Sequence, residues 1–207
     1  MKESARRVRG VITDFVQEFV ENPYLCYTEH GLHALLYTML YNALPAEQRY
    51  ATWKGHKVCV VQKEYPTAGR LGASKRQNWD ISLLKTPPVS LYPDEANAFD
   101  YLRLTAVVEF GMNATKEHLA RDIECLDHKD ANLDHGFAIH LYRLSKSKCK
   151  FSRRDWSPNA RSILGKEKVA QMIAGTEVEV LYAMYDATGK HENGAWHLVG
   201  DSITRLI

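Results

Sequence analysis

The chain has 207 residues, of which 45% are hydrophobic and 25% charged, with 7 prolines and 12 glycines. This is ordinary globular composition, so it excludes a collagen-like, coiled-coil or largely disordered chain. The 27 basic and 25 acidic residues nearly cancel, leaving a formal charge of +2.

The sequence contains no stretch that approaches the roughly 18 consecutive apolar residues of a membrane span. The charged N-terminus is not followed by the apolar run of a secretory signal. The four cysteines are widely spaced and form no CxxC pair. We therefore expect a cytoplasmic protein with free thiols and no membrane partner.

The first half of the chain predicts two helices and then three strands. Apolar residues recur at helical spacing over residues 11–20, and Thr28 is a predicted N-cap for a long helix that ends near Pro45. Three strands are expected next, separated by turns and by a long exposed loop over residues 86–100. They cover residues 56–64, 77–84 and 102–110.

The second half predicts a crossover helix and further strands. An amphipathic helix is expected over residues 115–127, and another over 158–174. Strands are expected over residues 136–144 and 177–185, with a last short one near 196–198. Three successive strands before a crossover helix predict a mixed β-sheet, antiparallel at first, with helices on both faces of one α/β domain. That domain divides into an N-terminal helical extension (1–27), a core (28–144) and a C-terminal addition (145–207).

Two acidic residues lie inside apolar strands. Asp80 follows Trp79 in the second strand, and Glu109 lies between Val108 and Phe110 in the third. A carboxylate in a covered strand is costly unless it is paired or binds a metal. If the two strands pair, the carboxylates meet at one end of the sheet, where with a main-chain carbonyl they suit Mg²⁺ or Mn²⁺. The alternative is that each acid lies at a strand end and faces solvent or an arginine.

Three side chains of the predicted long helix lie beside this pattern. Glu29 falls in the first turn, where an acid also complements the helix dipole. His30 and His33 flank the same turn and can join a metal site or be ordinary polar residues.

The element order and these acids together resemble the PD-(D/E)XK nuclease superfamily, which has the restriction-endonuclease-like fold with an α-β-β-β-α-β core. The family pattern has Glu on the first helix, Asp on the second strand and Glu-x-Lys on the third. Glu29, Asp80 and Glu109 match the three acids over a resemblance that covers roughly residues 28–144. One departure is Gly111, which stands where the family has its catalytic Lys.

The resemblance implies a metal-dependent nuclease that hydrolyses phosphodiester bonds in DNA or RNA. Asp80, Glu109 and the carbonyl of Phe110 would hold Mg²⁺ or Mn²⁺, and Glu29 a second metal or an ordered water. Lys116, in the first turn of the second helix, is a candidate for the missing amine, and Lys63 is another. Both can equally be solvated surface residues. The alternative function is a catalytically inactive nuclease-like module that binds nucleic acid or a protein partner.

A basic segment begins at the fourth predicted strand and continues beyond it. Residues 134–168 contain nine bases against three acids. In an extended chain alternate residues project to the same side about 6–7 Å apart, close to the phosphate repeat of a nucleic-acid strand. The segment therefore predicts a face that binds nucleic-acid backbone, or else a solvated loop; its members are Lys146, Lys148, Lys150, Arg153 and Arg154. The sequence is compatible with a homodimer.

Overall fold

The computed structural model describes residues 3–69, 71–72, 77–91, 101–144 and 163–207. Its helices are α1 (Glu3–Glu21), α2 (Glu29–Ala43), the short 3₁₀ helix η1 (Ala46–Gln48), α3 (Lys116–Leu126) and α4 (Lys166–Ile173). Its strands are β1 (Tyr50–Trp53), β2 (His56–Cys59), β3 (Val61–Pro66), β4 (Asn78–Leu84), β5 (Leu104–Met112), β6 (Gly136–Leu144), β7 (Glu179–Asp186), β8 (Gly194–Val199) and β9 (Ser202–Arg205).

Seven strands form one mixed sheet in the order β3-β4-β5-β6-β7-β8-β9. The first three strands are antiparallel, β5, β6 and β7 are parallel, and the last two are again antiparallel. The predicted mixed sheet, antiparallel at first, is confirmed.

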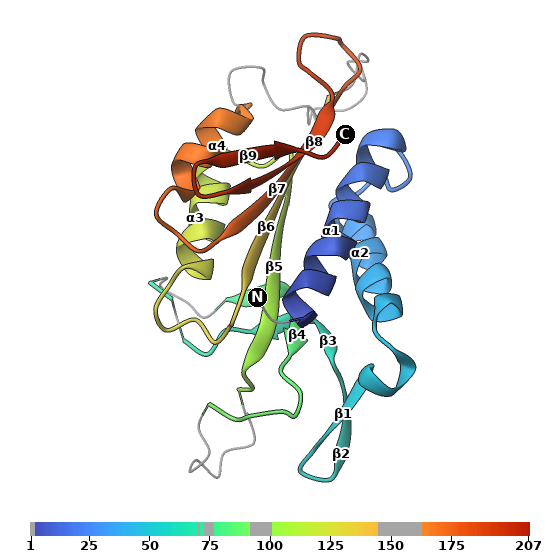
Figure 1. Cartoon of the computed structure of the whole chain (residues 1–207), viewed down its shortest axis with the longest axis vertical. Helices are drawn as coiled ribbons and strands as arrows, with labels where there is room; N and C mark the ends of the chain where they lie inside the picture. Colours follow the sequence, from blue (N-terminus) through green and yellow to red (C-terminus); the bar gives the residue numbers. More distant parts are fainter. Residues whose placement is uncertain (1–2, 70, 73–76, 92–100, 145–162) are drawn as a thin grey trace, which may run out of the picture.

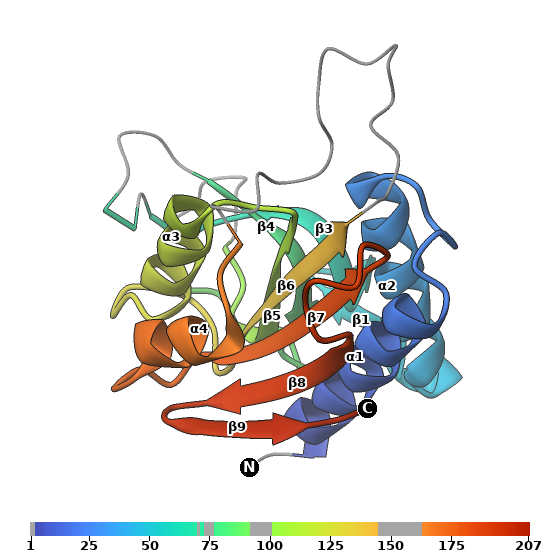
Figure 2. The same ribbon diagram turned by 90° about the horizontal axis from the view of Figure 1, so that it is seen from above.

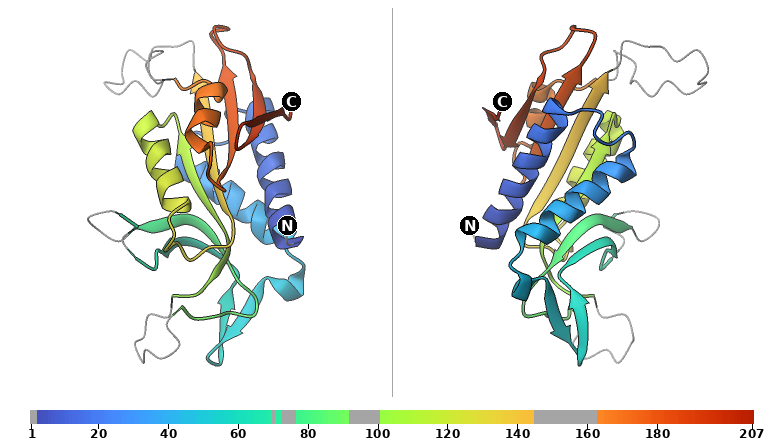
Figure 3. Two further views of the ribbon diagram at one scale, coloured as in Figure 1. Left: turned by 60° about the vertical axis from the view of Figure 1, so that its left-hand side comes forward. Right: turned by 90° about the vertical axis from the view of Figure 1, so that its right-hand side faces the viewer.

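Helices cover both faces of this sheet (Figure 1). The two views of Figure 3 show α3 and α4 on one face and α1 and α2 crossing the other. Two apolar clusters fill the spaces between these layers. Alternate residues of β5 point into each: Val107 packs on the α3 side, and Val108 and Phe110 pack on the α1–α2 side. The prediction that helices lie on both faces of the sheet is therefore confirmed.

The first helix is longer than the predicted 11–20. Its apolar stripe continues toward the N-terminus through Ala5 and Val8, which are buried like Ile12, Phe15 and Phe19. In Figure 2 the C-terminus lies beside this helix. Gln17 Nε2 donates a hydrogen bond to the carbonyl of Leu206 at 3.4 Å. The predicted extension thus packs on the sheet.

The predicted strand at residues 56–64 was wrong as a single element. The chain changes partner at Val60: β2 pairs with β1 in a separate hairpin, and β3 pairs with β4 in the main sheet. Figure 1 shows the hairpin projecting beyond the sheet. Its turn, Lys54-Gly55, has positive φ at both residues (48° and 81°), as a tight right-twisted hairpin requires. The apolar residues Val58, Val60 and Val61 run without a break across the junction, so the sequence pattern does not reveal the exchange of partners.

Two further differences concern the C-terminal part. The helix predicted over 158–174 is α4, only eight residues long, and residues 145–162 lie outside the described chain. β9, which the sequence analysis missed, has four residues and a largely exposed pattern. No helix among the described residues is both long and apolar enough to cross a membrane.

Candidate active site

The candidate site forms where β4 and β5 separate. Their antiparallel pairing includes Ile81↔Val108, and one further step in the same register sets Asp80 opposite Glu109. At that point a hydrogen bond to a side chain takes the place of the backbone hydrogen bonds between the strands. The N–H of Phe110 donates to Asp80 Oδ2 at 2.9 Å. The two predicted strands are therefore sheet neighbours, and their acids lie together where the ladder ends.

Glu29 reaches the same edge of β5 from α2. Thr28 is the N-cap of that helix, as predicted, and its Oγ1 accepts from the N–H of Gly31 at 3.0 Å. The carboxylate of Glu29 accepts a backbone hydrogen bond from Met112. Along a strand every second N–H and C=O points to the same edge, so Asp80 and Glu29 occupy successive positions on the edge that β4 leaves open. The carbonyl of Phe110 points toward that edge as well.

The carboxyl group of Glu109 is held among like charges. Burial raises its pKa well above the usual range, and the charges of Asp80 and Asp122 raise it further. Glu109 also shares a side-chain hydrogen bond with Asp80. Asp80, Glu109 and Asp122 therefore lie within direct electrostatic reach of one another.

Asp122 is the acid that the sequence analysis missed. It lies on α3 with a side chain 15% exposed, and burial raises its pKa to about 7. The charge of His118 acts to lower this pKa, and the charges of Asp80 and Glu29 act with burial to raise it. Asp122 occupies the apolar stripe that contains Leu119 and Ile123. The position of an acid within this apolar stripe is the sequence feature that could have identified Asp122.

His33 enters the site from the second turn of α2. It is 3% exposed, and its ring packs edge to face on Phe110 with centroids 4.6 Å apart. Its Nε2 lies 3.8 Å from Glu29 Oε1, and neither ring nitrogen has a hydrogen-bond partner among the described residues. Burial lowers its pKa, so the ring is held neutral. A neutral buried imidazole with free nitrogens next to carboxylates is a potential ligand.

The two candidate lysines are placed differently. Lys116 is exposed in the first turn of α3, and none of the contacts described for it reaches Glu29, Asp80 or Glu109. Lys63 is exposed on β3 opposite Ile81, and its positive charge helps to lower the pKa of His33. Lys63 is thus the lysine with an electrostatic effect inside the site.

A cavity of about 310 Å³ opens beside the carboxylates. Glu109 and Asp122 line it together with Glu64, Gln77 and Arg121. It gives a ligand access to the acidic side chains from the α3 face of the sheet.

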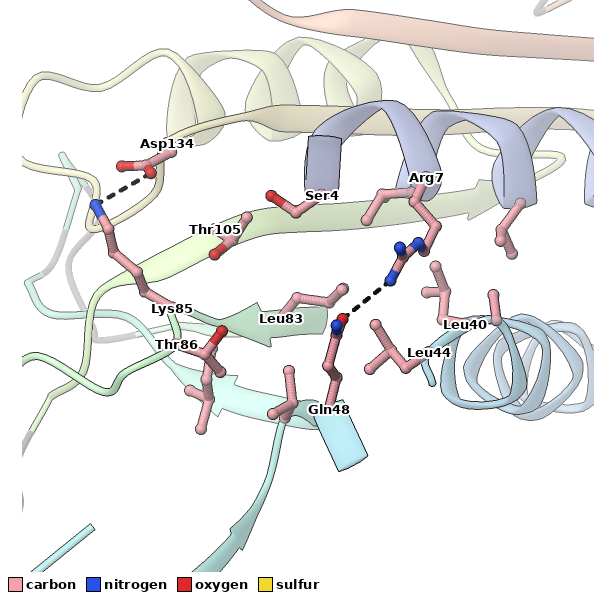
Figure 4. Close-up of a pocket in the computed structure, with 15 residues that line it drawn as sticks. Ser4, Arg7, Leu40, Leu44, Gln48, Leu83, Lys85, Thr86, Thr105 and Asp134 are labelled. Atoms are coloured by element: carbon pink, nitrogen blue, oxygen red, sulfur yellow. Dashed lines mark hydrogen bonds and ion pairs between the residues drawn. The ribbon is translucent and has the colours of Figure 1, made fainter. Parts of the chain in front are cut away.

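A second cavity, of about 280 Å³, lies between α1, α2 and β4 (Figure 4). Its charged groups are already engaged: Lys85 pairs with Asp134 at 3.2 Å, and Arg7 donates to Gln48 at 3.1 Å. Apolar side chains form much of the remaining wall. The carboxylate site is therefore the stronger candidate for a functional site.

The donor atoms suit a hard divalent cation. Mg²⁺ is commonly held by one or two carboxylates while it keeps several waters. Asp80, Glu109 and the Phe110 carbonyl would supply such a set. Among the described residues, no group of three or more His, Cys, Asp or Glu side chains is arranged to hold a metal ion.

The predicted nucleic-acid-binding residues fall outside the described chain. Lys146, Lys148, Lys150, Arg153 and Arg154 all belong to residues 145–162. The segment begins directly after β6, whose penultimate residue, Arg143, donates hydrogen bonds to the carbonyls of Pro23, Cys26 and Tyr27 in the loop before Glu29.

Comparisons of the chain with protein-family models, with curated proteins and with solved structures found no match.

Proposed function

We propose that this chain is a metal-dependent nuclease of the restriction-endonuclease-like type, which hydrolyses phosphodiester bonds in DNA or RNA. The observation that carries the proposal is the meeting of Asp80 and Glu109 where β4 and β5 separate, with Glu29 on the next position of the same edge. Carboxylates gathered from two strands and a helix around an open strand edge suit a cation and a phosphate group.

In this proposal Asp80, Glu109 and the Phe110 carbonyl hold Mg²⁺ or Mn²⁺, and Glu29 orders a water. The bound cation would lower the pKa of water and stabilise the negative charge that develops on the phosphate. The negative charge of these acids would repel a phosphate group until a cation is bound. Substrate binding would therefore depend on metal binding. The basic segment at 145–162 would bind the nucleic-acid backbone without reading sequence.

The test is cleavage of plasmid DNA, single-stranded DNA and single-stranded RNA in Mn²⁺ or Mg²⁺. We expect the wild type to cleave at least one substrate, and Asp80→Asn and Glu109→Gln to lose at least about a hundredfold in rate, because a bound metal contributes several kcal/mol to transition-state stabilisation. The exposed acid Asp14 provides a matched control, and Asp14→Asn should cleave like the wild type.

Other outcomes separate the alternative. A wild type that binds labelled oligonucleotides but cleaves none of them would favour the catalytically inactive module. Equal cleavage by wild type and both site variants would identify a contaminant and overturn the proposal.

A further inference from the structure

The side chain of residue 111 would have no room in this fold. Gly111 is buried on β5, two residues after Glu109. A Cβ built on it would lie 2.9 Å from the Cβ of Ala114, which real contacts do not reach. It would also meet the ring of His118, at 3.5 Å from Cδ2 and 3.7 Å from Nε2. The imidazole of His118 thus covers the position from which a side chain at 111 would project.

His118 is held there by its helix and by an acid. Thr115 is the N-cap of α3, and its Oγ1 accepts from the N–H of His118 at 3.3 Å, which fixes the first turn. The Nε2 of His118 lies 3.3 Å from Asp122 Oδ2, one turn further along the helix. The ring is about half exposed, so it is accessible to water and to a substrate.

The ring faces the carboxylate cluster from the α3 side. Its positive form interacts favourably with Glu29 on α2 and with Asp122 on its own helix, and unfavourably with His140 on β6. Histidine is the side chain that most readily exchanges a proton near neutral pH. A carboxylate that contacts an imidazole orients it and stabilises its protonated form.

We propose that His118, oriented by Asp122, is a catalytic residue of this site and accepts the proton of the attacking water. This inference rests on the proposed nuclease function and names the group that performs its proton transfer. The oxygen of water bonds to phosphorus while its proton passes to the imidazole. The bond from phosphorus to the leaving oxygen breaks, its electron pair stays on that oxygen, and a solvent proton neutralises it. His118 then releases its proton to solvent.

The experiment compares single-turnover cleavage by the wild type, His118→Gln and His118→Ala on the substrate that the wild type cleaves. General-base catalysis contributes roughly 10²–10⁴-fold, so both variants should be at least a hundred times slower. Added imidazole should restore part of the rate of His118→Ala. The rise of rate with pH on the acidic limb should disappear in His118→Gln. His56→Gln, in the exposed β1–β2 hairpin, is the matched control and should behave like the wild type.

Two measurements separate a catalytic role from a structural one. His118→Gln should unfold at the wild-type temperature, and in Ca²⁺ it should bind an uncleavable phosphorothioate oligonucleotide within about threefold of the wild-type affinity. A variant that cleaves within threefold of the wild type and keeps the acidic limb would overturn the role of His118, while the loss of cleavage in Asp80→Asn would still support the nuclease. A wild type that cleaves nothing would overturn both.

Discussion

An ion pair between Arg9 and Glu179 joins the N-terminal helix α1 to strand β7 of the sheet. The carboxylate of Glu179 on β7 accepts from Arg9 Nε at 2.6 Å and contacts His197 Nε2 at 2.7 Å. Burial acts to raise the pKa of Glu179, but the hydrogen bonds of His197 and Arg9 outweigh it and hold the pKa at about 2. The ionised form is therefore stabilised by folding.

This depressed pKa predicts how stability depends on pH. The stabilisation is fully present above the ordinary carboxyl pKa of 4.5 and is lost as the pH falls toward 2. Glu179→Gln should lower the free energy of unfolding at pH 7 by about 2–3 kcal/mol and flatten its decline between pH 4.5 and 2. Urea titrations at a series of pH values measure both effects.

The neighbouring acid Glu177 is exposed and serves as the control. Glu177→Gln should leave the pH dependence unchanged. If Glu179→Gln shows the wild-type slope below pH 4.5, the ion pair does not exist in solution.

At the scale of the element, the start of α2 decides where Glu29 lies. The hydroxyl of Thr28 accepts from the N–H of Gly31, whereas that of Thr38, in the same helix, donates to the carbonyl of Ala34 at 2.8 Å. The first bond satisfies an N–H that the helix leaves unpaired, and the second competes with a bond that the helix already makes.

Substitution of the two threonines should therefore have effects of different size on stability. Thr28→Ala should destabilise the protein by about 1 kcal/mol, and Thr28→Ser should recover most of the loss. Thr38→Ala should change stability by a few tenths of a kcal/mol or less, because alanine has the higher helix propensity. Chemical denaturation followed by circular dichroism distinguishes these cases, and equal losses at both positions would contradict the capping role.

At the scale of the whole molecule, α1 is part of the structure that supports the site. Phe15 is 1% exposed and packs edge to face on Phe110, with centroids 5.9 Å apart. Phe110 in turn contacts His33 and donates its N–H to Asp80. A residue of the N-terminal helix therefore lies one contact away from the acids.

Phe15→Ala should cost about 3–5 kcal/mol, since it leaves a cavity at a fully buried aromatic position. Tryptophan fluorescence, which includes Trp79 and Trp196 in the opposite apolar cluster, should report the same midpoint as far-UV circular dichroism. The exposed neighbour Asp14→Ala should be nearly neutral. Separate midpoints for the two signals would show that the two faces of the sheet unfold independently.

The local pattern of apolar residues predicted those helices and strands whose position depends on the burial of one apolar helix face or one apolar strand. α2, α3 and β6 lie within a residue or two of the expected ranges because each has a continuous apolar stripe or run with a clear cap or turn at its ends. The same reasoning missed β1 and β9 and joined β2 to β3. These short strands are defined by their partner, and four residues of alternating pattern do not identify a partner.

The sequence by itself determined the mixed sheet, its covered central strand and the choice of Asp80 and Glu109, because an acid in an apolar strand conflicts with its own surroundings. Only the tertiary structure decided which other groups join them. Asp122 and His118 arrive from α3, and Glu29 and His33 from α2, on opposite faces of the sheet. They meet because β4 leaves the edge of β5 at Asp80, so that side chains from both layers can reach the same open edge. The separation of β4 from β5 is set by packing across the molecule, so the spacing of residues along the sequence does not predict it.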